Sequence, residues 1–206
     1  MTNFLFDASG LDAPYLDSFD ATCRALKDKF KVEVPGHINF QLQQFEVLKH
    51  YNNVNTRDAF AIKNGGLDSY MLFLELSHKA TVKKNDLKHH HPYQPWALTY
   101  LRQDFGRVII RTETLFDKLK ELLLPIELDF KEDKPFSDRF YVLTDDRHKA
   151  ETAMNQAFRD AVMAIKETDF IIEIYEHTLI IGNRKPILPE HACYLADFVN
   201  RLTNLK

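Results

Sequence analysis

The chain has 206 residues, of which 45% are hydrophobic and 12% are aromatic, and its formal net charge is −3. This composition is enough for a large hydrophobic core, so it excludes a disordered chain. The acidic balance also argues against nucleic-acid binding, because neutralising phosphates requires a basic surface.

The first predicted element is a helix over residues 12–30. Apolar side chains recur at spacings of three and four from Leu16 to Phe30, which places them on one helical face. The pattern then changes to an alternation of apolar and polar residues, which predicts a half-buried strand over residues 38–49. A slip in that alternation near Gln43 indicates a bulge.

Hairpins are predicted where turn residues separate alternating strands. Asn64-Gly65-Gly66 is the strongest of these signals, because Asn-Gly supplies the positive φ angles of a tight turn. The three expected hairpins join residues 60–62 to 70–76, 96–102 to 108–112, and 170–174 to 179–181.

The remaining elements complete a mixed architecture. Short alternating runs predict strands over residues 126–130 and 140–144, and 3.6-residue periodicity predicts helices over residues 115–123, 146–167 and 189–205. Many hairpins with few strand–helix–strand crossovers predict an α+β protein, in which a mostly antiparallel, hairpin-built sheet packs against about four amphipathic helices.

The stretch over residues 79–95 is polar and contains proline, so it is expected to be an exposed loop. We expect a single α+β domain over residues 1–206. An alternative divides it into two subdomains, about 1–85 and 95–206, joined by this loop.

The histidine run within this loop is the one candidate metal site. In an extended chain His89 and His91 point to the same side, so the two could share a divalent metal, with Asp86, His78 or another distant histidine as a further ligand. The run lacks a diagnostic spacing such as H-E-x-x-H. The alternative interpretation is a solvated loop that is rich in histidine.

Other reactive-looking residues have structural explanations. Asp145 and Asp146 precede a predicted helix, so they are expected to cap it. Cys23 and Cys193 are far apart in sequence and are expected to be reduced thiols. An aromatic and basic stretch around Trp96 could stack nucleic-acid bases, but alternation on a strand explains it equally as a core face.

The segment Phe136-Ser-Asp-Arg-Phe140-Tyr-Val-Leu-Thr-Asp-Asp146 and the hairpin that ends at Ile181 resemble the C-terminal part of an uncharacterised bacterial family, a domain of unknown function. Members carry a similar F-x-x-x-F-x-V-x-x-x-D run before a helix and a hairpin. The resemblance covers about the last third of the chain and consists of packing residues. It therefore implies a bacterial protein with this fold element and assigns no catalytic residues.

These observations predict a non-catalytic protein- or ligand-binding domain, either as a homo-oligomer or with a protein partner. The alternative is a metal-dependent hydrolase built around His89 and His91. The most apolar stretches are too short to span a bilayer, so no membrane span is expected and the protein is expected to be soluble and cytoplasmic. A nucleic-acid partner is not expected.

Overall fold

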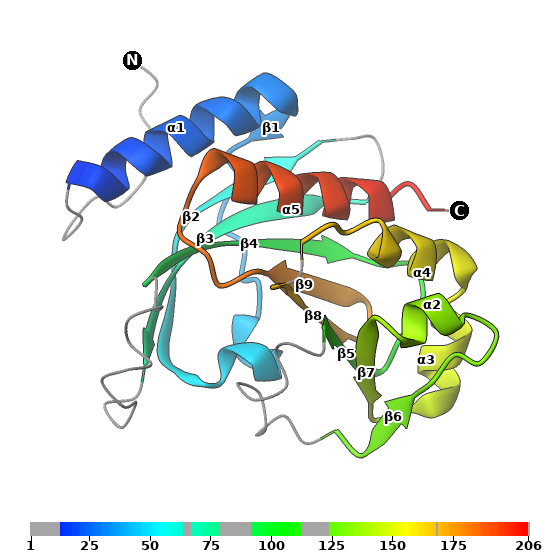
Figure 1. The fold of residues 1–206 in the computed structure, drawn as a ribbon. Helices are drawn as coiled ribbons and strands as arrows, with labels where there is room; N and C mark the ends of the chain where they lie inside the picture. The colour runs from blue at the N-terminus through cyan, green and yellow to red at the C-terminus, as the bar shows by residue number, and fades with distance from the viewer. Residues whose placement is uncertain (1–12, 64–66, 79–91, 113–123, 168, 206) are drawn as a thin grey trace.

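The computed structural model describes residues 13–63, 67–78, 92–112, 124–167 and 169–205, and Figure 1 shows their arrangement. The helices are α1 (Ala13–Lys29), α2 (Lys134–Ser137), α3 (Arg147–Ala153), α4 (Gln156–Met163) and α5 (Pro189–Leu202). The strands are β1 (Val32–Glu33), β2 (Tyr51–Ile62), β3 (Ser69–His78), β4 (Tyr93–Tyr100), β5 (Arg107–Thr112), β6 (Ile126–Leu128), β7 (Phe140–Thr144), β8 (Ile171–Tyr175) and β9 (Thr178–Gly182).

In the described residues, the strands form one nine-stranded sheet in the order β1-β2-β3-β4-β9-β8-β5-β7-β6, and every neighbouring pair is antiparallel. This confirms the predicted α+β class. The exposed loop predicted over residues 79–95 is wrong at its end, because Tyr93–Pro95 belong to β4 and Gln94 and Pro95 are buried. Strands β3 and β4, which this segment joins, pair with each other, and Glu75 lies opposite Tyr93.

Two of the three predicted hairpins are confirmed. Strand β2 pairs with β3, and β8 pairs with β9; the Asn64-Gly65-Gly66 turn itself lies outside the described residues. The hairpin predicted between residues 96–102 and 108–112 is wrong, because β4 pairs with β9 whereas β5 pairs with β8 and β7. The turn residues are present, but the chain after β4 crosses to a more distant position in the sheet.

Helices α1 and α5 pack against each other over one face of the sheet, here called the helical face (Figure 1). The register places one apolar row across this face, and every member of the row is buried. In strand order the row is Phe60, Met71, Ala97, Ile181, Ile172, Ile110, Val142 and Leu128. The predicted amphipathic helices at the two ends of the chain therefore bury their apolar faces on this row.

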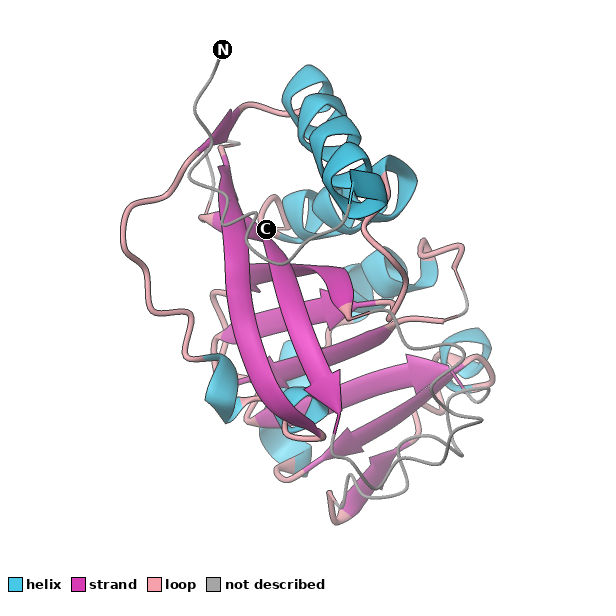
Figure 2. Cartoon of the chain, turned by 90° about the vertical axis from the view of Figure 1, so that its left-hand side faces the viewer, coloured by secondary structure: helices cyan, strands magenta, loops and turns pink. Residues whose placement is uncertain are grey.

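The opposite face is covered by residues 34–50, here called the strap, which runs from β1 to β2 (Figure 2). The strand predicted over residues 38–49 is wrong: the strap forms two short 3-10 turns, Leu42–Gln44 and Glu46–Leu48, and Gln41 adopts a left-handed φ of 50°. Phe45, Val47 and Leu48 are buried against the sheet. The alternation of residues 38–42 thus reflects intermittent burial of an irregular segment.

The helix predicted over residues 146–167 is two helices. Met154 leaves the helical region with ψ of 52°, and the Asn155 side chain accepts a hydrogen bond from the Phe158 N–H at 3.0 Å to start α4. The helix predicted over residues 115–123 lies outside the described residues.

The segment that carries the family resemblance consists of packing and capping residues, as predicted. Phe136, Phe140 and Val142 are buried in the core. Arg139 donates to the backbone carbonyls of Met163, which is the last residue of α4, and of Ile165, which follows the helix. These contacts tie the segment to the core and to the end of α4.

Candidate functional site

The histidines of the candidate metal site, His89 and His91, lie outside the described residues, as does Asp86. His78 ends β3. Among the residues that the structure describes, no three His, Cys, Asp or Glu side chains come together as metal ligands. The histidine site therefore stays a prediction.

The acidic pair before α3 is structural. The Asp146 side chain accepts from the Lys149 N–H at 3.1 Å and caps the helix, and Asp145 accepts from the Arg107 N–H at 2.8 Å. The capping interpretation is confirmed for Asp146, whereas Asp145 bonds the first residue of β5 and does not cap the helix. In the aromatic stretch, Trp96 and Phe105 are buried, so their role as core residues is also confirmed.

Both cysteines are free thiols. Cys23 lies in α1 and is buried among apolar side chains. Burial raises the pKa of its thiol from 9.0 to about 12, so it stays protonated at neutral pH. Burial also raises the pKa of the half-buried Cys193. Neither thiol is activated as a nucleophile.

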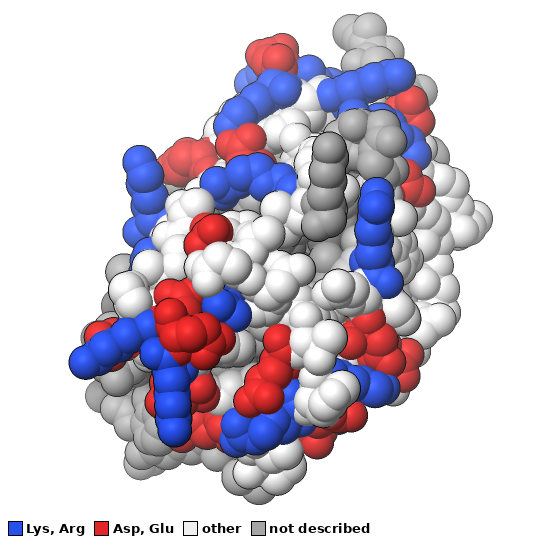
Figure 3. All heavy atoms as spheres, turned by 90° about the vertical axis from the view of Figure 1, so that its right-hand side faces the viewer, with Lys and Arg blue, Asp and Glu red and all other residues white. Residues whose placement is uncertain are grey.

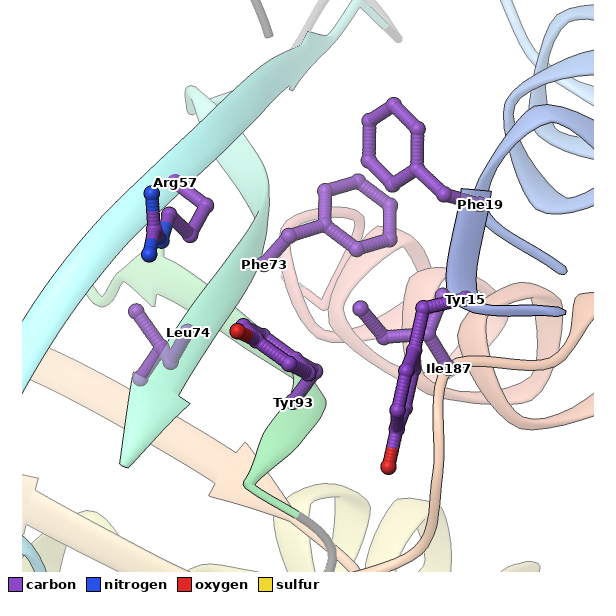
Figure 4. Close-up of a pocket in the computed structure, with 7 residues that line it drawn as sticks. All are labelled: Tyr15, Phe19, Arg57, Phe73, Leu74, Tyr93 and Ile187. Carbon is purple, nitrogen blue, oxygen red and sulfur yellow. The ribbon is translucent and has the colours of Figure 1, made fainter. Parts of the chain in front are cut away.

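A small cavity of about 10 Å³ lies between α1, the β2–β3–β4 part of the sheet and the segment before α5. Figure 4 shows that its walls come from these separate parts of the chain. We call it the α1 cavity. Its lining residues are Tyr15, Phe19, Arg57, Phe73, Leu74, Tyr93 and Ile187.

The aromatic walls of the α1 cavity are held by edge-to-face contacts. The ring centroids of Tyr15 and Tyr93 lie 4.9 Å apart, as do those of Phe19 and Phe73, and Phe60 supports Phe73 at 5.8 Å. Such pairs add stability beyond the area that they bury. These contacts therefore hold the helix against the sheet around this small space.

The polar edge of the cavity is a network across three strands. Asn55, Glu75 and Tyr93 lie side by side in β2, β3 and β4, because the register pairs each with the next. Arg57, at a bulge in β2, donates from Nε to Glu75 Oε2 at 3.0 Å, while Asn55 and the Tyr93 hydroxyl donate to the same carboxylate at 3.2 and 3.5 Å. Glu75 thus links the guanidinium of Arg57 to the ring of Tyr93 in the cavity wall.

The ionisation of this network follows from its contacts. The hydrogen bond from Arg57 holds the pKa of Glu75 below its ordinary 4.5. Burial, followed by the charge of Glu75, raises the pKa of Tyr93 above 10.0. At neutral pH the network therefore consists of the ionised carboxylate of Glu75, which accepts hydrogen bonds from the guanidinium of Arg57 and from the neutral phenol of Tyr93.

The described residues that line the α1 cavity include no serine, cysteine, histidine or aspartate. The site thus lacks the usual nucleophiles and metal ligands. What it offers is an apolar, aromatic interior with hydrogen-bonding groups at its edge, which is the composition of a binding pocket.

Sequence reasoning missed this site. Its residues are separated by up to 172 positions, from Tyr15 to Ile187, and their convergence depends on the pairing of β2, β3 and β4. One local signal existed: Tyr15 and Phe19 are four residues apart, so they share a helix face.

In the helices that the structure describes, none combines the length and the apolarity needed to cross a bilayer.

Comparison with known proteins gives a likeness of fold. No family model matches the chain, and no curated protein matches it in sequence. A solved structure that is similar is the crystal structure of the mycobacterial trehalose monomycolate transport factor A, TtfA, with a TM-score of 0.52, 10% sequence identity, and coverage of 89% of this chain and 90% of that chain. No family model supports the resemblance to a domain of unknown function that the sequence suggests. The chain therefore shares the overall fold of the mycobacterial transport factor.

Proposed function

We propose that the chain is a non-catalytic protein- or ligand-binding domain, and that an apolar or aromatic group of the bound molecule inserts at the α1 cavity, between Tyr15 and Tyr93. The observation that carries this proposal is the aromatic lining, in which the ring centroids of Tyr15 and Tyr93 lie 4.9 Å apart. Binding sites combine mostly apolar walls with a few placed polar groups. Here Arg57 and Tyr93 supply the polar groups, positioned by Glu75.

The size of the cavity sets the kind of group that it accepts. The α1 cavity has a volume of about 10 Å³, which is roughly the space of one water molecule, so an aromatic or branched side chain enters only where Tyr15 moves away from Tyr93. A large molecule would therefore be held by one anchoring group, as hot spots hold protein partners.

The structural likeness supports a role in binding rather than in catalysis. The solved structure of similar fold is named a transport factor, and transport requires reversible binding. At 10% identity the likeness extends to the fold, and the ligand of this chain has to be argued from its own cavity.

The proposal is tested by titrating the protein with N-acetylphenylalaninamide and, in parallel, N-acetylalaninamide, while recording ¹H–¹⁵N chemical shifts. We expect saturable shifts near α1 and β4 with the phenylalanine compound only. Tyr15→Ala should weaken this binding by about tenfold, because it removes an aromatic wall.

Leu16→Ala is the matched control, since Leu16 is also half-buried in the first turn of α1 but does not line the cavity. It should leave the affinity unchanged. Equal responses to the two compounds, or equal losses in the two variants, would contradict the proposal.

A further inference from the structure

A second concave surface lies at the C-terminal end of α5, where the β4–β5 turn and the α3–α4 junction meet it. Its volume is about 100 Å³, less than that of a typical small-molecule pocket, so it can hold part of a ligand rather than enclose a whole one. We call it the α5 groove. Its lining residues are Leu67, Tyr100, Leu101, Arg102, Gln103, Phe105, Ala153, Asn155, Phe158, Leu202, Thr203 and Leu205, none of which lines the α1 cavity.

The base of the α5 groove is apolar and well packed. Phe105 and Phe158 are buried, with ring centroids 5.0 Å apart, and Leu202 is buried beside them in the same core. Leu101 and Leu205 are half-buried. These leucines leave apolar surface at the groove that an alkyl chain could cover.

The β4–β5 turn that forms one rim is anchored at both ends. The Leu101 N–H donates to the His177 carbonyl at 2.7 Å, and the Phe105 N–H donates to the Glu176 carbonyl at 3.0 Å. Asp104 bonds Lys149 of α3 at 2.7 Å. The backbone that carries Arg102 is therefore fixed before any ligand binds, which lowers the entropic cost of binding.

Arg102 differs from the other arginines near the core. Arg57, Arg107 and Arg159 each form an ion pair with a carboxylate. Arg102 is exposed, and its side chain has no hydrogen bond or ion pair within the described part of the chain. A guanidinium without a partner at the rim of an apolar groove complements an anionic head group.

The surface around the α5 groove does not by itself select an anionic ligand. Figure 3 shows acidic and basic side chains interspersed on the side of the molecule that lies to the right in Figure 1. Asn155 and Thr203 use their side-chain oxygens within the protein, to cap α4 and to bond the Asn200 carbonyl. Arg102, next to the exposed amide of Gln103, is therefore the group left to recognise a charge.

We propose that the α5 groove binds an anionic amphiphile, with its carboxylate on Arg102 and its alkyl chain along Leu101, Leu202 and Leu205. This site is separate from the α1 cavity, so it stands or falls independently of the function proposed above.

The test is isothermal titration of the whole chain with octanoate below its micelle concentration, with octanol and octyltrimethylammonium as neutral and cationic comparisons. We expect octanoate to bind with one site per chain and more tightly than either comparison. Arg102→Gln should weaken octanoate binding about tenfold, Arg102→Lys should retain most of it, and Leu205→Ser should weaken all binding of the alkyl chain.

Arg24→Gln, an exposed arginine in α1, is the matched control and should leave octanoate binding unchanged, as should the cavity variant Tyr15→Ala. Octanoate binding that is lost in Tyr15→Ala but kept in Arg102→Gln would overturn the proposal. Absence of saturable binding, or equal affinity for the cationic amphiphile, would overturn it as well.

Discussion

The carboxylate of Glu173 accepts a hydrogen bond from the backbone N–H of Val47 at 2.9 Å, so a charged residue in the middle of β8 holds the strap. The Glu173 side chain is fully buried, and it also bonds the Glu46 N–H and the guanidinium of Arg107. Arg107 in turn donates to the Gln44 carbonyl at 2.9 Å. The N–H groups that begin the second 3-10 turn thus find their acceptor on the sheet rather than within the strap.

Removing the Glu173 carboxylate should destabilise the fold strongly. Burial raises its pKa above 4.5, which shows how costly the isolated charge is, and Arg107 with two N–H groups compensates that cost. In Glu173→Leu those groups lose their partner, so we expect a loss of about 3 kcal/mol in the free energy of unfolding, measured by urea denaturation.

The double variant Glu173→Leu/Arg107→Leu should be less destabilised than Glu173→Leu alone, because it leaves no unpaired charge. Glu151→Leu is the control, because Glu151 pairs with Arg147 on the surface, where the side chains of the two are 48% and 52% exposed. This variant should lose much less of the free energy of unfolding than Glu173→Leu. Equal effects of Glu173→Leu and Glu151→Leu would show that the strap is not held in this way.

The Asp133–Arg159 pair should make stability depend on acid pH. Arg159 Nε bonds Asp133 Oδ2 at 2.8 Å, and this bond holds the pKa of Asp133 below 3.8. At pH values between the lowered pKa of Asp133 in the folded protein and its ordinary pKa, the unfolded chain binds more protons than the folded one. The stabilisation is therefore present above about pH 4 and is lost as the pH falls through the folded pKa.

The measurement is the melting temperature of wild type and Asp133→Asn between pH 6 and pH 2.5. The gap between the two proteins should shrink as the pH falls. The buried carboxyl of Glu173 has the opposite effect on stability: its pKa is raised in the folded protein, so protonation favours the folded state. Glu173 therefore cannot cause a loss of stability as the pH falls. A constant gap would show that the pair contributes no pH dependence.

Metal analysis of untagged protein separates the two functional hypotheses. A metal-dependent enzyme built on His89 and His91 requires about one zinc, manganese or iron ion per chain, lost in the variant His89→Ala/His91→Ala. The binding-domain proposal predicts metal-free protein, with the variant as stable as wild type. Elemental analysis by plasma mass spectrometry, with thermal melts with and without a chelator, decides between them.

The parts of the fold that could be predicted from sequence are those that local chemistry determines. Helices α1 and α5 follow from their periodicity, and the hairpin of β8 and β9 follows from two alternating runs separated by a short turn. The break at Asn155 was missed, although an asparagine that caps a helix is a local signal.

The rest depends on contacts between distant segments. The first half of β2 is polar because it lies at the sheet edge beyond the reach of β1, so the sequence pattern predicts a strand only over residues 60–62. The pairing of β4 with β9 brings together Trp96 and Gly182, which are 86 positions apart in the sequence. The α1 cavity likewise depends on the pairing of β2, β3 and β4. No local pattern encodes such convergence.

Trp96 and Gly182 provide the last prediction. They lie opposite each other in β4 and β9, and a Cβ placed on Gly182 would overlap the indole ring of Trp96. The ring is 1% exposed and donates from Nε1 to Gln94 at 3.3 Å, so it cannot move away without losing packing and a hydrogen bond. Gly182→Ala should therefore cost between about 1 and 3 kcal/mol of stability.

Because Trp96 is the chain's single tryptophan, its fluorescence reports directly on this site. Gly182→Ala should shift the emission to longer wavelength, as the displaced ring meets a more polar environment, and should lower the urea midpoint. Gly36→Ala is the matched control, since nothing lies within 4 Å of a Cβ at Gly36, and its stability should change by less than about 0.5 kcal/mol. If both variants kept the wild-type emission and midpoint, the close packing of the indole on β9 would be wrong.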